Sequence, residues 1–299
     1  MTWVYERPCT LEFPRCLFAE VRMPLSGVLL HGIALLEENR VGSPRMNAEV
    51  LLMFVLGCDR AYLYAHPERE LSSDEQNRYD EALEQRARGV PSQYITGHQE
   101  FWGLDFIVGP AVLIPRPETE HLVEAVLDLC KTIERPRIVD VGTGSGCVAL
   151  ALASELPRAE IHATEISADA LEIARANAAR LSLDHRVTFH ATDLLHGIAG
   201  PFDIVASNPP YVGESEYDKV QIEVRKFEPR CAVFAGADGM DVIRRLAPQA
   251  RAALKPGGFL AMEIGYSQEA AVRAVLRDWQ DVRAVPDLQG IPRVIVAKN

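Results

Sequence analysis

The stretch Asn208-Pro209-Pro210-Tyr211 is the part of this sequence best suited to chemistry. It follows the apolar run 202–207, which is typical of a strand, so it lies at a carboxyl end, where open α/β sheets bind ligands. Pro209 and Pro210 lack backbone donors and restrict φ, so the strand gives way to a stiff loop. This loop presents a side-chain amide, carbonyl oxygens without neighbouring N–H groups, and an aromatic ring. It is suited to accept both hydrogens of a substrate –NH2 group and to cover its plane.

Nitrogen alkylation is the chemistry that such a loop favours. An amide or an aromatic amine is a poor nucleophile, so an enzyme that alkylates it needs acceptors that draw electron density onto nitrogen and orient its lone pair. The loop Asn208–Tyr211 offers such acceptors. A proline-rich turn without function can have the same sequence, so the interpretation depends on motifs elsewhere in the chain.

A second candidate site is the glycine-rich run that follows the apolar residues 138–141. Glycines at alternate positions allow a ligand to approach the backbone, and the helix after Gly146 presents free N–H groups to a carboxylate. A dinucleotide site is the main competitor, but its fingerprint requires a third glycine where this chain has Cys147. We therefore expect a cofactor-binding loop made of Gly142, Thr143, Gly144, Ser145 and Gly146.

Two acidic residues after the next two expected strands extend this site. Glu165 is placed to bind both hydroxyls of a ribose, and Asp193 to accept a hydrogen bond from an adenine amino group. Each has an ordinary alternative, since a strand-end carboxylate can be solvated and an aspartate there often forms a cap or an Asx turn. The glycine loop, both acids and Asn208 nevertheless all fall at carboxyl ends of parallel strands. We therefore assign Asn208 to the cofactor site as well as to the substrate site.

The elements that must position these residues alternate between strand and helix over residues 117–299, the expected catalytic domain. Repeated βα units imply a doubly wound α/β sheet with right-handed crossovers. The expected strands, of which the last two form an antiparallel pair, are Arg137–Val141, Glu160–Ile166, Val187–Thr192, Phe202–Ser207, Phe259–Gly265, Val282–Pro286 and Arg293–Ala297. The expected helices are Glu118–Ile133, Cys147–Leu156, Ala168–Leu181, Gly239–Leu254 and Gln268–Trp279.

Residues 25–97 show helical periodicity instead and predict a small helical bundle. The start signals are Ser26 as a cap for Val28–Asn39, Ser43-Pro44 for a helix to Leu56, and a capping box at Ser72 and Glu75. Residues 1–24 show no periodicity, so we expect a disordered N-terminal extension there, of which residues 1–22 are dispensable. Residues 98–116 form the expected linker, a β-hairpin in which Glu100–Val108 and Ala111–Ile114 flank Gly109-Pro110.

Composition argues against several classes of function. The chain has 42 acidic and 31 basic residues and a net charge of −11. Proteins that grip nucleic acid usually have a basic face, so we expect no direct nucleic-acid contact. The 6 cysteines form no Cys-x-x-Cys pair, so we expect no disulfide framework, no metal site and a cytoplasmic location. The sequence also lacks a membrane-length apolar run and a signal-peptide core.

Together these motifs resemble the release-factor glutamine methyltransferases, the HemK/PrmC family of class I S-adenosylmethionine-dependent methyltransferases. The resemblance extends from about Leu25 to the C-terminus, and it is specific because Asn-Pro-Pro-Tyr is joined to an Ile-Pro-Arg-Pro-x-Thr-Glu stretch and a helical N-terminal domain. The motifs that carry it are Ser43–Glu49, Gln93–Gly97, Phe101–Leu104, Leu113–Glu120, Asp140–Gly146, Asn208–Tyr211, Phe227–Arg230, Gly236–Gly239, Lys255–Gly258 and Glu263–Gly265.

The resemblance implies a methyltransferase sheet, with S-adenosylmethionine as cofactor. It implies that the substrate is the glutamine in the Gly-Gly-Gln motif of class 1 peptide-chain release factors, which act in translation termination. It assigns catalysis to Asn208, Pro209 and Tyr211, and substrate binding to these three residues and Pro210. Asn208 Oδ1 and the Pro209 carbonyl would each accept one amide hydrogen, while Tyr211 would pack against the amide plane. We expect a monomer whose helical domain recognises the release factor.

Some features depart from the family or have two interpretations. The family more often has aspartate where Glu165 stands, and residues 1–22 precede its usual start. Arg116 either approaches the cofactor or substrate, or pairs with a nearby glutamate, Glu118 or Glu120. Glu228 either orders the loop after Tyr211 or is an ordinary surface acid.

Three other functions agree less well with the sequence. Methylation of a nucleic-acid base is disfavoured by the acidic charge. Methylation of a ribosomal-protein glutamine is disfavoured by the stretch 116–120. A non-catalytic module that binds an adenosyl ligand is disfavoured by the intact Asn208 and Tyr211.

Overall fold

The structure, a computed structural model, describes residues 23–299. The chain divides after Glu84 into two compact units, which we call the helical unit (residues 23–84) and the sheet unit (residues 85–299). The boundary falls within the stretch 25–97 that we expected to form one helical domain. The expectation that residues 1–22 are disordered and dispensable lies outside the described residues.

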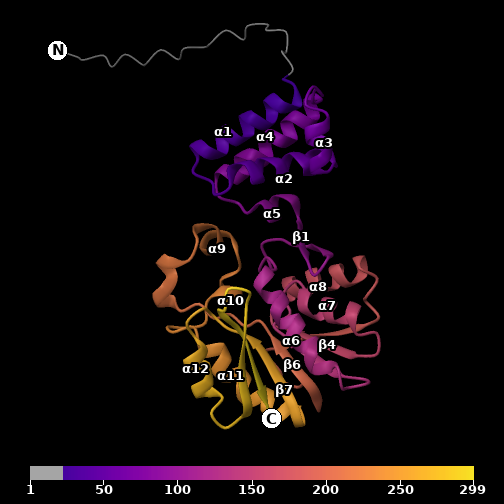
Figure 1. The fold of residues 1–299 in the computed structure, drawn as a ribbon, viewed down its shortest axis with the longest axis vertical. Coiled ribbons are helices and arrows are strands. Elements are labelled where there is room, and N and C mark those ends of the chain that lie inside the picture. The colour runs from indigo at the N-terminus through magenta and orange to yellow at the C-terminus, as the bar shows by residue number, and fades with distance from the viewer. Residues whose placement is uncertain (1–22) are drawn as a thin grey trace, which may run out of the picture. The chain divides into compact units, whose positions relative to one another are not determined.

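The helical unit forms because apolar residues recur at helical spacing and bury one face of each helix. It contains α1 (Leu25–Glu38), α2 (Pro44–Leu56), α3 (Arg60–Ala65) and most of α4 (Ser73–Ala87), as Figure 1 shows. On α1 the buried face includes Leu25, Val28 and Leu36. Gly32 lies on this face, where a Cβ would be only 2.3 Å from the hydroxyl of buried Tyr79 on α4. A glycine at this point therefore lets α1 and α4 pack closely.

Of the three helix starts predicted from the sequence, one is confirmed by its hydrogen bonds, one lacks the expected hydrogen bond and one is wrong. The capping box at the start of α4 is confirmed, since Ser72 N donates to Glu75 Oε2 at 2.8 Å and Glu75 N donates to Ser72 Oγ at 3.2 Å. Ser43 does precede α2, but its side chain makes no capping hydrogen bond. The cap at Ser26 was wrong: α1 begins at Leu25, after Pro24. The Pro24 carbonyl accepts from Gly27 N and Val28 N, so Ser26 already lies within the first turn.

The β-hairpin exists, but its turn is not where we expected it. Strands β1 (His98–Phe101) and β2 (Leu104–Ile107) pair through a turn at Trp102-Gly103. Both turn residues have positive φ, 54° and 69°, which is the conformation that two-residue hairpins require. Gly109-Pro110 lies beyond β2, and the structure has no strand at Ala111–Ile114. The Gly-Pro pair was mistaken for the turn because a left-handed Trp102 has no sequence signal.

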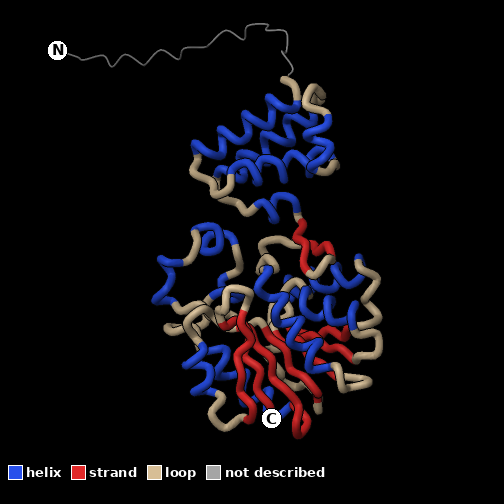
Figure 2. The backbone as a smooth tube through the Cα atoms, in the orientation of Figure 1, coloured by secondary structure: helices blue, strands red, loops and turns tan. Residues whose placement is uncertain are grey.

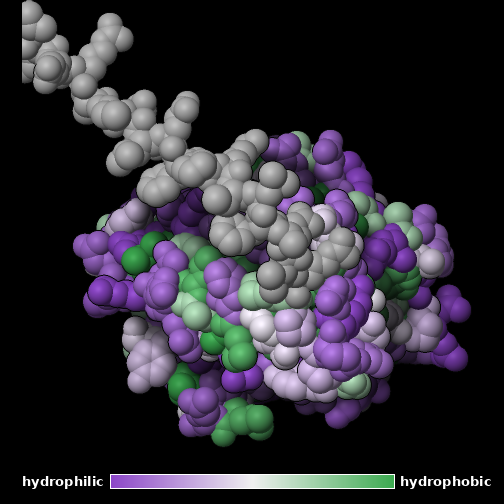
Figure 3. Space-filling model, turned by 90° about the horizontal axis from the view of Figure 1, so that it is seen from above, coloured by the Kyte–Doolittle hydropathy of each residue, from purple (hydrophilic) through white to green (hydrophobic). Residues whose placement is uncertain are grey.

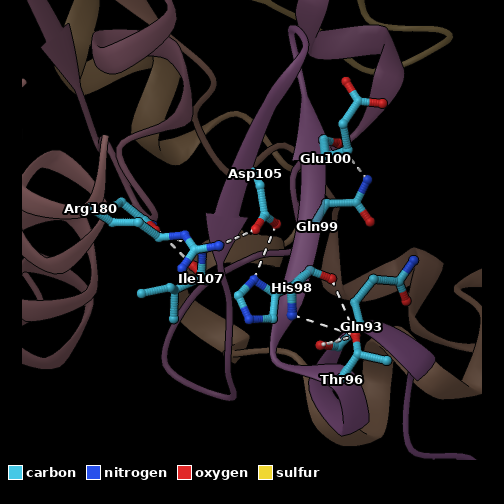
Figure 4. Close-up of polar contacts among 9 residues, drawn as sticks. Gln93, Thr96, His98, Gln99, Glu100, Asp105, Ile107 and Arg180 are labelled. Carbon is cyan, nitrogen blue, oxygen red and sulfur yellow. Dashed lines mark hydrogen bonds and ion pairs between the residues drawn. The ribbon is translucent and has the colours of Figure 1, made fainter. Parts of the chain in front are cut away.

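Polar contacts attach this hairpin to helix α8 (Ala168–Arg180). Asp105 accepts from the Arg180 guanidinium and contacts His98 Nδ1 at 3.1 Å (Figure 4). Asn177, which is fully buried, accepts from Ile107 N at 2.6 Å and donates to the Ile107 carbonyl at 3.0 Å. The Asn177 amide also donates to the Ser145 carbonyl at 2.9 Å. One side chain thus joins the hairpin to the glycine loop.

The sheet has the expected seven strands, in the order β5-β4-β3-β6-β7-β9-β8. Strands β3 to β7 are parallel, and β9 pairs antiparallel with both β7 and β8, which confirms the antiparallel last strand. Figures 1 and 2 show the sheet with helices against it. The strands are β3 (Arg137–Val141), β4 (Glu160–Glu165), β5 (Val187–Ala191), β6 (Phe202–Ser207), β7 (Leu254–Glu263), β8 (Gln280–Pro286) and β9 (Pro292–Lys298).

Two hydrophobic cores cover the two faces of this sheet, because successive residues of a strand point to opposite sides. In β3, Ile138 packs in one core with α6 and α7, while Val139 packs in the other with α11 and α12. The flanking helices are α6 (Glu120–Cys130), α7 (Cys147–Glu155), α8, α11 (Asp241–Ala253) and α12 (Glu269–Val275). The sheet unit also has α5 (Ser92–Thr96) and η1 (Pro117–Thr119), and three short helices that we did not expect: η2 (Glu214–Lys219), α9 (Ile222–Phe227) and α10 (Arg230–Val233).

Candidate active site

A cavity of about 310 Å³ lies at the carboxyl ends of the parallel strands. The chain passes from β3 outward to β4 and β5 and then returns to β6 beside β3. The loops after β3 and β6 therefore diverge, and such a reversal is the usual ligand site of an open α/β sheet. The predicted site residues that line the cavity are Gly142, Thr143, Gly144, Ser145, Glu165, Asp193, Asn208, Pro209 and Pro210. Gly146 and Tyr211 are not among its lining residues.

The glycine loop leaves open space toward the cavity. Gly142 and Gly144 have positive φ, 73° and 57°, and a Cβ on either would meet no protein atom within 4 Å. A ligand therefore has room to approach the backbone at both positions. Gly146 differs, because a Cβ there would lie 3.1 Å from Leu150 and 3.3 Å from Ala174. Its lack of a side chain serves the packing of α7 against α8.

The two predicted cofactor acids have different surroundings. Glu165 is buried, with Oε2 accepting from Gly144 N at 2.9 Å and Oε1 accepting from Ile166 N and Ser167 N at 2.9 and 3.0 Å. The carboxylate is therefore held in one orientation by backbone donors. Asp193 is 44% exposed and forms an ion pair with Arg245 of α11, which also lines the cavity. Both side chains reach solvent, so the pair contributes little stability and a ligand can replace it at small cost.

A chain of hydrogen bonds lies behind Asn208. Its Nδ2 donates to Thr119 Oγ1 at 2.9 Å, and Thr119 Oγ1 donates to Glu263 Oε2 at 2.6 Å. The Tyr211 hydroxyl donates to Glu263 Oε1 at 3.2 Å. Burial raises the pKa of Glu263 to about 7, against the lowering effect of the bonds from Thr119 and Tyr211. Burial and the nearby Glu263 carboxylate raise the pKa of Tyr211 as well.

One more buried acid lies against the glycine loop. Asp140, the fourth residue of β3, accepts from Thr143 Oγ1 at 2.6 Å and lines the cavity. Burial raises the pKa of Asp140 to about 6, against the lowering effect of this hydrogen bond. Within the described residues 23–299, no group of three or more His, Cys, Asp or Glu side chains is placed to hold a metal ion. No helix in that range is long and apolar enough to cross a membrane.

Comparisons with known proteins agree with this geometry. Residues 28–97 match the PrmC N-terminal domain, and residues 119–225 match the methyltransferase small domain. The chain is 59% identical over 266 residues to the release factor glutamine methyltransferase of Koribacter versatilis (strain Ellin345), covering 88% of this chain and 94% of that protein. The chain belongs to this family. The family's enzyme from Moorella thermoacetica is 43% identical over 92% of this chain and 98% of its own length.

Solved structures that resemble this member of the release factor glutamine methyltransferases confirm the fold. The catalytic domain of hMettl16, in complex with a MAT2A 3′UTR hairpin, matches with a TM-score of 0.54 and 19% identity over 73% of this chain and 81% of that chain. The T. thermophilus 16S rRNA N2 G1207 methyltransferase RsmC matches with a TM-score of 0.50 and 17% identity, over 68% of this chain and 49% of that one. Both support the class I methyltransferase fold.

Two residues of this methyltransferase were not singled out from the sequence. Thr119 lies in the motif Leu113–Glu120 and Glu263 in Glu263–Gly265, both of which carried the family resemblance. Nothing in either motif indicates that their side chains meet, because the contact joins residues 144 positions apart. The sequence offers one indication of their role: each of these two motifs contains a polar side chain, a hydroxyl in the first and an acid in the second.

Arg116 and Glu228 form an ion pair with each other. The expected alternative partners of Arg116, Glu118 and Glu120, were therefore wrong, and Glu228 is a buried residue rather than an ordinary surface acid. Arg116 lines the cavity and is 33% exposed, whereas the Glu228 side chain is 2% exposed. Glu228 Oε2 has no hydrogen-bond partner among the described residues. Arg116 thus supplies the positive charge that pairs with the buried Glu228 carboxylate.

We expect Arg116→Met to lower the free energy of unfolding by about 2 kcal/mol, because it leaves the buried Glu228 carboxylate without its partner. Glu228→Gln should have a smaller effect, since the partly exposed Arg116 can turn to water. The double variant should recover most of the loss. Urea unfolding at pH 7 measures all three. Equal losses in the two single variants, or additive losses in the double variant, would contradict this account.

Proposed function

We propose that this enzyme transfers a methyl group from S-adenosylmethionine to the side-chain amide nitrogen of the glutamine in the Gly-Gly-Gln motif of class 1 peptide-chain release factors. One observation carries the proposal: Asn208 faces the same cavity as the glycine loop Gly142–Ser145. A nitrogen held at Asn208 and a cofactor held at the glycine loop therefore share one cavity. Family membership supports the choice of a release factor as the substrate.

The residues around the cavity fit S-adenosylmethionine. The open space beyond Gly142 and Gly144 admits a ligand against the backbone. Glu165 and Asp193 offer carboxylate oxygens to hydroxyl and amino groups. Together with Thr143 and Ser145, these residues would hold the cofactor. When bound, S-adenosylmethionine supplies a methyl group on a positively charged sulfur, so its thioether leaves neutral and needs no acid.

The role of the protein is then positioning and electrostatic orientation. Asn208 Oδ1 and the Pro209 carbonyl each accept one hydrogen of the substrate amide, which directs the nitrogen lone pair toward the methyl carbon. Transfer would form the N–C bond as the C–S bond of the bound cofactor breaks, with the electron pair of that bond staying on sulfur. The nitrogen then loses a proton to water. No general base is required before attack, because the proton becomes acidic only after the methyl group has been transferred.

A methylation assay tests the proposal. Purified class 1 release factor is incubated with the enzyme and methyl-labelled cofactor, and the modified residue is mapped by mass spectrometry. We expect one methyl group on the glutamine of the Gly-Gly-Gln motif, and none when that glutamine is replaced by alanine. Label in rRNA, in DNA or in a ribosomal protein, with none in the release factor, would overturn the proposal.

We propose that residues 25–97 recognise the release factor. A glutamine side chain offers few contacts, so selection of one glutamine requires a larger protein surface. In the helical unit, several large apolar side chains are exposed: Leu30, Met46, Phe54 and Tyr64. Figure 3 shows one face of the molecule on which hydrophobic patches interrupt a largely hydrophilic surface.

Removal of the helical unit should leave cofactor binding close to that of the full chain and reduce release-factor methylation by roughly tenfold or more. The helical domain expected from the sequence ends at Gly97. The sheet unit nevertheless includes α5, whose Tyr94 hydroxyl donates to the Val112 carbonyl at 2.6 Å. The fragment is therefore best started at Gly89, after α4. Circular dichroism and cofactor titration show whether it is folded. A folded fragment with full activity on release factor would contradict the proposal that residues 25–97 recognise the substrate.

The proposal also covers the enzyme's location, its contact with nucleic acid and its oligomeric state. Release factors act on ribosomes in the cytoplasm, so we place the enzyme there. The net charge of −11 argues against direct nucleic-acid contact. We propose that the enzyme acts as a monomer, which light scattering of the purified protein measures.

A further inference from the structure

The Thr119 hydroxyl has one hydrogen to donate and two neighbours that compete for it. The hydroxyl donates this hydrogen to Glu263 Oε2 at 2.6 Å. Its oxygen is then available only as an acceptor toward Asn208, and Asn208 Nδ2 donates to it at 2.9 Å. Thr119 is 1% exposed and lines the cavity, and Glu263 is 2% exposed, so bulk solvent has little access to either side chain.

This order of donors selects one of the two orientations of the Asn208 amide. With Nδ2 bound to Thr119, Oδ1 is turned away from Thr119, and Asn208 lines the cavity. In the flipped orientation, Oδ1 would face a hydroxyl whose hydrogen is already given to Glu263, and two acceptors would meet in a buried place. Leaving buried polar groups without partners is costly, so the flipped orientation is disfavoured.

We propose that Glu263, acting through Thr119, is a positioning residue that holds the Asn208 amide with its oxygen toward the nitrogen to be methylated. The inference rests on the proposed function, which places the substrate nitrogen at Asn208. Neither Thr119 nor Glu263 takes part in bond making, and their effect reaches the substrate through the orientation of one amide.

The arrangement depends on Glu263 being a carboxylate. A protonated Glu263 can donate to Thr119, whose hydrogen then becomes available to Asn208 Oδ1, so the amide presents its –NH2 group to the substrate –NH2 group. Five groups on neighbouring elements face this carboxyl: Tyr211 and Thr119 bind it, Glu118 raises its pKa, Arg293 lowers it, and the buried Cys147 thiol, whose own pKa Glu263 raises, lies near it. Since burial places the pKa of Glu263 at about 7, kcat should rise with pH through that value.

Thr119→Val and Thr119→Ser form the matched pair that tests this inference. Valine keeps the shape but removes both hydrogen bonds, so we expect kcat to fall roughly ten- to hundredfold with the cofactor Kd nearly unchanged. Serine restores the hydroxyl and should recover most of the lost kcat. Thr188→Val, at an exposed position of β5, serves as the control for threonine-to-valine replacement and should have no effect.

Glu263→Gln provides the second measurement, which does not depend on the folding of the valine variant. The pH profile of kcat between pH 5.5 and pH 8.5 should lose its step near 7, and kcat at the upper end should fall roughly tenfold. Asp140, whose pKa burial raises to about 6, remains in this variant and accounts for any residual change at lower pH. An unchanged step in Glu263→Gln would overturn the inference, as would full activity of folded Thr119→Val.

Asn208→Ala separates this inference from the proposed function. If Asn208→Ala is inactive and Thr119→Val is as active as the wild type, the positioning role is wrong while the proposed site stands. If Asn208→Ala retains normal activity, the proposed assignment of Asn208 is itself wrong. Thermal melting and cofactor titration of each variant establish that the folded, cofactor-binding protein is being compared.

Discussion

Asn208→Ala should reduce kcat for release-factor methylation by roughly a hundredfold or more, because an oriented polar partner at the reacting atom contributes about that much. The alanine variant loses the oxygen that accepts a hydrogen of the substrate amide. It also loses the donor to Thr119, but the bond between Thr119 and Glu263 remains available. Binding of S-adenosylmethionine should stay close to that of the wild type, because the glycine loop, Glu165 and Asp193 are unchanged.

Two measurements check this result. Single-turnover methylation gives the rate of the chemical step, and calorimetry gives the cofactor Kd. Asn299→Ala is the matched control, because Asn299 lies outside the cavity and outside residues 25–97, and its side chain donates only to the Arg251 and Lys255 carbonyls among the described residues. It should leave the chemical rate unchanged. Near-normal turnover by Asn208→Ala would show that the substrate nitrogen is held elsewhere.

Gly144→Val should weaken cofactor binding by roughly a hundredfold, since a branched side chain forced into an occupied space costs about 1–3 kcal/mol or more. In the protein alone, a Cβ at Gly144 meets no atom within 4 Å. The clash therefore arises only with the bound ligand. A valine would also strain a backbone at φ 57° and so disturb the hydrogen bond from Gly144 N to Glu165 Oε2.

Gly57→Val is the control that separates backbone strain from ligand exclusion. Gly57 has a similar φ of 62°, and a Cβ there also meets no atom within 4 Å, but Gly57 lies at the end of α2 and outside the cavity. Both variants should lose similar stability in urea unfolding, and only Gly144→Val should lose cofactor affinity. Equal cofactor Kd values for the two variants would show that the glycine loop does not hold the cofactor.

The sequence predicted the sheet well, because alternating apolar runs and glycine-rich turns leave few topologies once crossovers are right-handed. It also predicted that the glycine loop, Glu165, Asp193 and Asn208 come together, since parallel strands bring their carboxyl ends to one edge, and all of them except Gly146 line one cavity. It did not predict the hairpin turn, where Trp102 takes a left-handed conformation that glycine or asparagine usually adopts. It missed the short helices between residues 214 and 233, which are too brief for helical periodicity.

The parts of the site that escaped prediction are contacts between distant residues. The sequence singles out Asn208 by its local motif, but Thr119 meets Asn208, and Glu263 meets Thr119, only after η1, β6 and β7 have come together. For the same reason, Arg116 was expected to pair with a neighbouring glutamate and instead pairs with Glu228, 112 residues away. Local sequence patterns indicate which helices and strands form, whereas the choice of an ion-pair partner depends on tertiary packing.

Asn177 determines where this chain could be divided into exchangeable modules. A two-stranded hairpin is marginally stable alone, and this one has the backbone groups of Ile107 satisfied by a side chain of α8. The hairpin is therefore structurally part of the sheet unit, although it precedes α6, the first long helix of that unit, in the sequence. A chimaera that grafts another recognition module onto this enzyme should keep residues from Gly89 onward, and a junction placed after the hairpin would remove the Ile107 N–H donor of Asn177 Oδ1 and one acceptor of its Nδ2.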